Sequence, residues 1–103
     1  MKITVIHKAM RDETPTAVAL VNVPTEITDM EDALEYAYRW TQNIVGSWSL
    51  KIGDDANSNV TVMGDVSSGM GLRSTSMGDQ ILVGNKKYVV AMMGFETLEG
   101  EKI

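Results

Sequence analysis

Residues that could support catalysis are few in this chain and are not spaced for a shared mechanism. His7 is the only histidine, and its place at the end of an apolar run is typical of a surface residue. No serine or carboxylate can be assigned to it by spacing, so the sequence predicts no catalytic triad. The paired carboxylates Asp54 and Asp55 lie in a polar loop with no neighbour to adjust their pKa values for acid–base catalysis. We therefore expect a protein that is not an enzyme.

Motifs for metals and cofactors are also incomplete. The chain has no cysteine, which removes disulfides, thiolate chemistry and cysteine-containing zinc sites. Asp55, Asn57 and Asn59 match the opening of a calcium-binding loop, but Val60 stands where that loop needs glycine and Val66 where it needs glutamate. We expect no cofactor and no bound metal.

The segment Gly69–Asp79 has the composition of a loop that could hold a small anion. Gly69 and Gly71 precede Arg73 and two serines, and backbone amides with hydroxyls suit phosphate groups. The Gly-Lys-Ser/Thr sequence of a phosphate-binding loop is missing, and the residues that follow favour a strand. A structural loop is the favoured interpretation, in which Asp79 and the serines bond the backbone at the start of a hairpin. A small-ligand or nucleotide-binding domain with Arg73 as the anion anchor remains an alternative.

The charge balance bears on the class of partner. The formal net charge is −5, from 14 acidic and 9 basic residues, which argues against direct binding to nucleic acid. Two acidic patches are candidate protein-binding sites, one on a predicted helix and one in a loop. Their residues are Asp29, Glu31, Asp32 and Glu35, with Asp54 and Asp55. Arg73 is a further candidate protein-binding residue.

Hydropathy predicts a cytoplasmic protein that does not enter a membrane. No segment approaches the roughly 20 apolar residues of a membrane span. The first residues carry a charge but no apolar run of signal-peptide length.

One main helix is predicted over residues 29–44. Thr28 with Glu31 forms a capping box at its start, and Gly46 is a natural stop. An apolar stripe at helical spacing predicts the buried side. Its residues are Met30, Ala33, Leu34, Ala37, Thr41 and Ile44.

Alternating and β-branched runs predict the strands. They cover residues 2–7, 16–23, 47–52 and 60–63, and a β-hairpin over 80–92 turns at Gly84, Asn85 and Lys86. Together these elements predict a single α+β domain spanning 1–103, mostly an antiparallel sheet of about 4–6 strands packed on one helix.

Large apolar residues outside the periodic runs are expected mainly in the core. Trp40, Trp48, Met92 and Met93 are the ones that would also suit an interface, because methionine and tryptophan adapt to partner surfaces.

The last third of the chain contains Arg73–Ile81 (RSTSMGDQI), followed by Tyr88–Val90 and Gly94-Phe95. In these residues it resembles the YodL-like and related accessory domains of phages, plasmids and conjugative elements. The upstream Glu35–Tyr38 is similar as well. Where that family tends to have a histidine before the first serine, this chain has Arg73. The resemblance implies a small α+β accessory domain of a mobile element, a context in which anti-CRISPR inhibitors are found.

We therefore predict a protein-binding accessory protein of a phage or mobile element. It would inhibit a host defence complex in the host cytoplasm by covering a basic surface that normally holds nucleic acid. The expected partner is a host protein or nucleoprotein complex, and the chain itself is expected to be a monomer or homodimer. A structural protein that oligomerises through a sheet edge is the remaining alternative.

Overall fold

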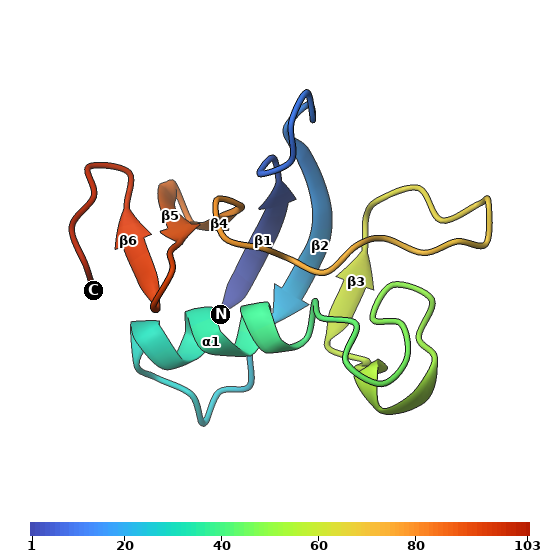
Figure 1. Cartoon of the computed structure of the whole chain (residues 1–103). Coiled ribbons are helices and arrows are strands. Elements are labelled where there is room, and N and C mark those ends of the chain that lie inside the picture. The colour runs from blue at the N-terminus through green and yellow to red at the C-terminus, as the bar shows by residue number, and fades with distance from the viewer.

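The computed structural model describes residues 1–103 and contains one α-helix, one short 3₁₀-helix and six strands. All neighbouring strands pair antiparallel in the order β3-β2-β1-β4-β5-β6, with α1 against one face of the sheet (Figure 1). The predicted α+β class, with one main helix and four to six strands, is confirmed. The bounds are β1 Lys2–His7, β2 Thr16–Asn22, α1 Met30–Arg39, η1 Gly53–Asp55, β3 Val60–Val62, β4 Gln80–Val83, β5 Lys86–Val90 and β6 Phe95–Thr97.

The core lies between the helix and the sheet. Strand β1 alternates between the two faces, so Ile3 and Val5 are fully buried beneath α1. The helix contributes Ala33, Leu34 and Ala37, all fully buried, and small residues on its inner side let it approach the sheet closely. The segment that leads into β4 crosses the same face of the sheet beside the helix (Figure 1).

The helix starts one residue later than its predicted cap. Asp29, and not Thr28, is the N-cap, and its carboxylate accepts a hydrogen bond from the Asp32 backbone N–H at 3.2 Å. The predicted capping box of Thr28 and Glu31 is therefore wrong. No helix of the structure is long and apolar enough to cross a membrane.

The helix also ends earlier than predicted. It stops at Arg39, and Trp40 has φ −88° and ψ 7°. Thr41 remains buried and bonds back to the Ala37 carbonyl at 2.9 Å, but Ile44 is 63% exposed and is not part of the buried stripe. The chain leaves the helical path because a buried carboxylate from η1 binds the backbone N–H groups of residues 44–46.

Residues 47–52 form a turn and not the predicted strand. A single bridge joins Ser47 to Ile52, and Lys51 adopts φ 59° between them. Trp48 is fully buried while Ile52 is 55% exposed, so the large residues do not share one face. Trp48 reaches the core from a turn, where its Nε1–H donates to the Arg73 carbonyl at 3.0 Å. A buried residue in a turn therefore gave the sequence the look of an alternating strand.

The predicted β-hairpin is confirmed as β4 and β5, joined through Gly84 at φ 61° and Asn85. Neither strand of this hairpin is a free edge, because β4 pairs with β1 and β5 pairs with β6. The outer side of β6 is occupied in turn by the last residues: Thr97 N–H donates to the Glu101 carbonyl at 2.8 Å. The hairpin therefore offers no open edge for the oligomer considered from the sequence.

Candidate functional site

The most connected polar side chain is Asp79, which is completely buried directly before β4. Its carboxylate accepts hydrogen bonds from the backbone N–H groups of Lys8, Ala9 and Ser76, each at 2.8 Å. Arg73 adds two further bonds at 2.7 and 2.8 Å. Burial alone would raise the pKa of Asp79, but the Arg73 guanidinium and the backbone donors outweigh it and hold the pKa at about 2.

Every N–H of the Arg73 guanidinium is used within the chain. Two donate to Asp79, one to the Ser74 carbonyl at 2.9 Å, and the remaining two to Glu13 at 2.6 and 3.3 Å. The hydrogen bond to Asp79 is the largest of the effects that raise the pKa of Arg73. An anion anchor needs free donors, so this geometry disfavours the alternative in which Arg73 holds a phosphate. Arg73 instead ties together the loops before β2 and before β4.

His7 is buried, only 3% exposed, and not the surface residue expected from its position. Its Nε2 lies 3.0 Å from Thr75 Oγ1 and 4.0 Å from Asp79 Oδ2. Burial is the main reason that the pKa of His7 is lowered; Arg73 lowers it further, whereas Asp79 and Glu13 act in the opposite direction. The imidazole is therefore neutral near pH 7.

The contacts of His7 do not match a nucleophile with its general base. Thr75 donates its hydroxyl proton to Thr41 Oγ1 at 2.8 Å, and Thr41 donates to the Ala37 carbonyl. With that proton committed, His7 Nε2 must act as the donor to Thr75, whereas a general base must accept there. The neighbouring Asp79 faces the same ring nitrogen and not the opposite one. This chain of hydrogen bonds links the sheet to the end of α1.

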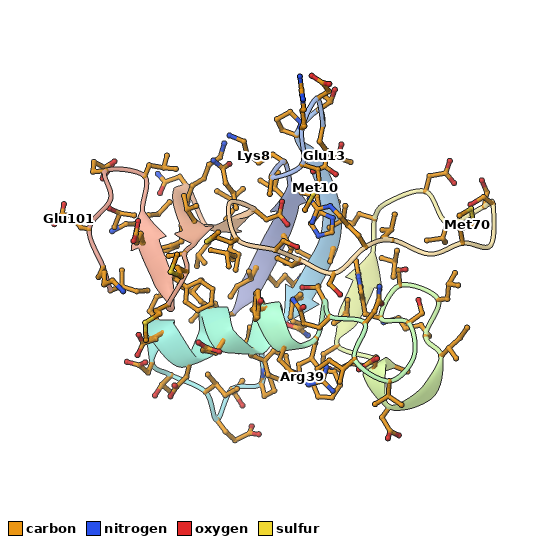
Figure 2. All side chains as sticks on the ribbon, viewed as in Figure 1. Lys8, Met10, Glu13, Arg39, Met70 and Glu101 are labelled. Carbon is orange, nitrogen blue, oxygen red and sulfur yellow. The ribbon has the colours of Figure 1, made fainter.

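A groove of about 370 Å³ opens beside this network. Its walls include the two carboxylates Glu13 and Asp65, while its only cationic side chain is Arg73, whose donors are already occupied. Its lining residues are His7, Glu13, Thr16, Val18, Gly64, Asp65, Gly71, Leu72 and Arg73. Figure 2 shows Glu13 near Met10 on the loop after β1, and Met70 on a separate projecting loop. The electrostatics of this groove disfavour a nucleotide phosphate.

Asp55 does not belong to an exposed acidic patch. Its carboxylate is buried and accepts hydrogen bonds from the backbone N–H groups of Ile44, Val45 and Gly46 at 2.7 to 2.8 Å. Arg39 lies 3.3 Å from its other oxygen. These backbone bonds, with that from Gly46 the largest, lower the pKa of Asp55 despite burial. The grouping of Asp55 with Asp54 as a surface for a basic partner is therefore wrong.

The four helix carboxylates, in contrast, are exposed and lie together over the first half of α1. None of them takes part in an ion pair. Asp29 additionally caps the helix through the Asp32 backbone N–H. Glu31 and Glu35 are four residues apart and face the same direction, an arrangement that costs rather than contributes stability. Exposed Asp54 lies outside this group, in η1 next to Asp55, whose carboxylate contacts Arg39 in the last turn of the helix.

A shallow hollow of about 120 Å³ continues this acidic surface onto the sheet. Glu35 and Tyr38 form its helix side, and Met92 and Phe95 its sheet side. Its full lining is Glu35, Tyr38, Val90, Ala91, Met92, Gly94 and Phe95. Met92 is 84% and Met93 74% exposed, so the expectation that both lie in the core is wrong, whereas Trp48 does lie there. We call the four helix carboxylates together with Met92 and Met93 the acidic–methionine surface.

Sequence reasoning missed the participation of His7, Glu13, Thr41 and Thr75 in the polar network. Glu13 and Arg73 are 60 residues apart, and His7 and Thr75 are 68 apart. The sequence indicated hydrogen bonds only for Asp79 and the serines of the same loop, because they stand directly before a predicted strand.

No family model, no curated protein and no solved structure matches this chain. Arguments about its function therefore rest on the geometry of its own residues.

Proposed function

We propose that this chain is a non-enzymatic protein-binding accessory protein of a phage or mobile element. It binds a host protein or nucleoprotein complex and covers a basic surface that holds nucleic acid, as anti-CRISPR inhibitors do. The observation that carries the proposal is the position of Glu35, which belongs both to the acidic helix face and to the apolar hollow beside Met92.

The charge of the acidic surface selects a partner of opposite charge. Asp29, Glu31, Asp32 and Glu35 are exposed, and no lysine or arginine lies in the chain between Arg11 and Arg39. A field of one sign speeds encounter with a surface of the opposite sign and disfavours wrong partners. Lysines and arginines that normally contact phosphates would also relieve the repulsion between Glu31 and Glu35.

Apolar side chains supply binding energy where charge gives mainly selectivity. Met92 and Met93 are largely exposed, and methionine adapts its shape to irregular partner surfaces. Full burial of one such side chain contributes on the order of 1.5–3 kcal/mol. The hollow next to Glu35 suits a basic side chain whose aliphatic stem packs on Tyr38 and Met92 while its charged end reaches the carboxylate.

The proposal is tested by competition on a purified CRISPR effector complex carrying its guide RNA. We expect the wild-type chain to reduce binding of labelled target DNA, measured by fluorescence anisotropy. Glu35→Lys should weaken the chain's affinity for the effector roughly tenfold and make it less sensitive to salt.

Asp54→Lys is the matched control, since it makes the same charge change at an exposed site in η1, outside the acidic–methionine surface. It should leave affinity within about twofold of wild type. Unchanged DNA binding in the presence of the wild-type chain contradicts inhibition of the effector. An equal loss in both variants contradicts a specific role for the helix face.

A further inference from the structure

The sheet face opposite α1 has no covering element. The core contains the side chains of Ile3 and Val5, so the alternate residues of β1 point to the other side. The single helix and the segment that leads into β4 both lie on the core side (Figure 1). The opposite face carries four apolar side chains that are partly exposed and do not pack against the core. They are Ile6, Leu20, Leu82 and Val89.

Strand register orders this open face into two adjacent rows. The first row runs from β2 to β5 and ends in a lysine: Leu20, Thr4, Leu82 and Lys87. The second runs from β1 to β6 and ends in a glutamate: Ile6, Gln80, Val89 and Glu96. Each row therefore alternates polar and apolar side chains, and its charged residue lies on one of the last two strands of the sheet, β5 or β6.

The two terminal charges are not paired within the chain. The ion pairs of the structure involve His7, Arg39 and Arg73, and neither Lys87 nor Glu96 takes part in one. Lys87 is exposed and Glu96 partly so. The open face therefore carries Lys87 and Glu96, neither of them in an ion pair, beside an apolar centre. Two further lysines border these rows: Lys2 precedes Thr4 on the same face of β1, and Lys102 is bridged to Glu96 and donates to the Met93 carbonyl.

We propose that the open face is the interface of a homodimer in which two sheets pack face to face. A twofold axis that runs across the strands, between the two rows, lays the first row of one copy over the second row of the other. Leu82 then packs between Ile6 and Val89 of the second copy, and Lys87 reaches Glu96 of the second copy. The pairing is self-complementary because each copy supplies one lysine and one glutamate.

The size of the face predicts a weak dimer. Its rows span four strands each at a spacing of about 4.8 Å, so the contact falls at or below the roughly 800 Å² per partner of standard interfaces. We expect a dissociation constant in the micromolar range, on the order of 1–100 μM. The helix carboxylates of the acidic–methionine surface lie on the opposite side of the sheet. The dimer therefore does not depend on the proposed function.

Sedimentation velocity over a range of concentrations tests the dimer. We expect wild-type chain to shift from monomer to dimer, and Leu82→Lys to remain monomeric because it places a charge in the apolar centre. Met70→Lys, on an 85% exposed side chain of a projecting loop, is the control and should dimerise as wild type. A wild-type chain that stays monomeric up to about 1 mM overturns the proposal, since that lies well above the expected constant.

A charge exchange tests the pairing itself, and it remains available if Leu82→Lys does not fold. Lys87→Glu and Glu96→Lys should each weaken dimerisation roughly fivefold or more, because each brings like charges together across the interface. An equimolar mixture of the two variants should recover dimers of mixed composition, in which both cross-pairs are again of opposite sign. Contacts within one chain cannot produce that recovery. Failure of the mixture to associate, or persistence of the dimer in folded Leu82→Lys, contradicts the proposed interface.

Discussion

Asp79 stabilises the fold by joining the segment after β1 to its own loop before β4, which are distant in sequence. It binds the backbone at Lys8 and Ala9, the backbone at Ser76 and the guanidinium of Arg73. A buried carboxylate with this many donors has its charge fully compensated, so its removal leaves both Arg73 and several backbone N–H groups without a partner.

Replacement of this carboxylate by an amide should therefore be costly. We expect Asp79→Asn to lower the free energy of unfolding by about 3–5 kcal/mol, because one partner of a buried ion pair is lost. Urea denaturation followed by tryptophan fluorescence measures the change, since Trp48 is fully buried. Asp54→Asn, on an exposed side chain, should not alter stability measurably. A loss below about 1 kcal/mol for Asp79→Asn would show that the network is dispensable.

Helix α1 is bounded at both ends by carboxylates with different tasks. Asp29 caps the first turn through the Asp32 backbone N–H, while Asp55 binds the three N–H groups that follow the helix. The second interaction explains why the helix stops at Arg39 although apolar residues continue at helical spacing. The chain at 44–46 is bound around Asp55 and exposes Ile44 and Val45.

The identity of the N-cap can be tested directly. Asp29→Ala should destabilise the fold by roughly 0.5–2 kcal/mol, the usual cost of losing a helix cap. Thr28→Ala should have little effect, because Thr28 lies outside the cap. Thermal unfolding followed by circular dichroism distinguishes the two variants. A larger loss for Thr28→Ala would restore the capping box that the sequence suggested.

The whole molecule is a two-layer structure closed by long-range polar contacts rather than by a large core. β1, near the chain start, pairs with β4, which begins at Gln80, and the network of Asp79, Arg73 and His7 lies beside that junction. His7 is buried among Asp79, Arg73 and Glu13, and its lowered pKa means that folding opposes its protonation. Stability should therefore depend on pH well above the range in which carboxylates titrate.

Acidification should reduce the free energy of unfolding in two windows. Below about pH 6.5 the unfolded chain takes up a proton on His7 that the folded chain resists, so stability falls as pH decreases. Below about pH 4 the same sign holds for Asp79, whose folded pKa of about 2 lies under its unfolded value. Glu13 and Asp55 contribute in the same direction. The Asp79 contribution is about 2 kcal/mol in total.

Denaturation curves between pH 8 and pH 3 measure both windows. His7→Gln keeps a donor toward Thr75 but cannot titrate, so it should remove the upper window and leave the lower one. Stability that is constant between pH 7 and pH 5 in the wild type, or an upper window that persists in His7→Gln, contradicts this account.

Local patterns were sufficient for most elements. Alternation at Lys2–His7 and β-branched content at Thr16–Asn22 predicted two central strands, and Gly84-Asn85 predicted the hairpin turn. Alternation misled at Ser47–Ile52, because a large residue can be buried from a turn as well as from a strand. The exposed carboxylates of α1 were also predictable, since helical spacing alone places them away from the buried stripe.

The composition and periodicity of the chain were enough to specify one α+β domain, its main strands and an acidic helix, because these depend on contacts among neighbouring residues. Only the tertiary structure decided that Asp55 and His7 are buried, that Arg73 has no free donor and that Met92 is exposed beside Glu35. Those outcomes depend on hydrogen bonds and packing between segments far apart along the chain. Such contacts become definite only when the order and register of the strands are set, and no local pattern encodes that order.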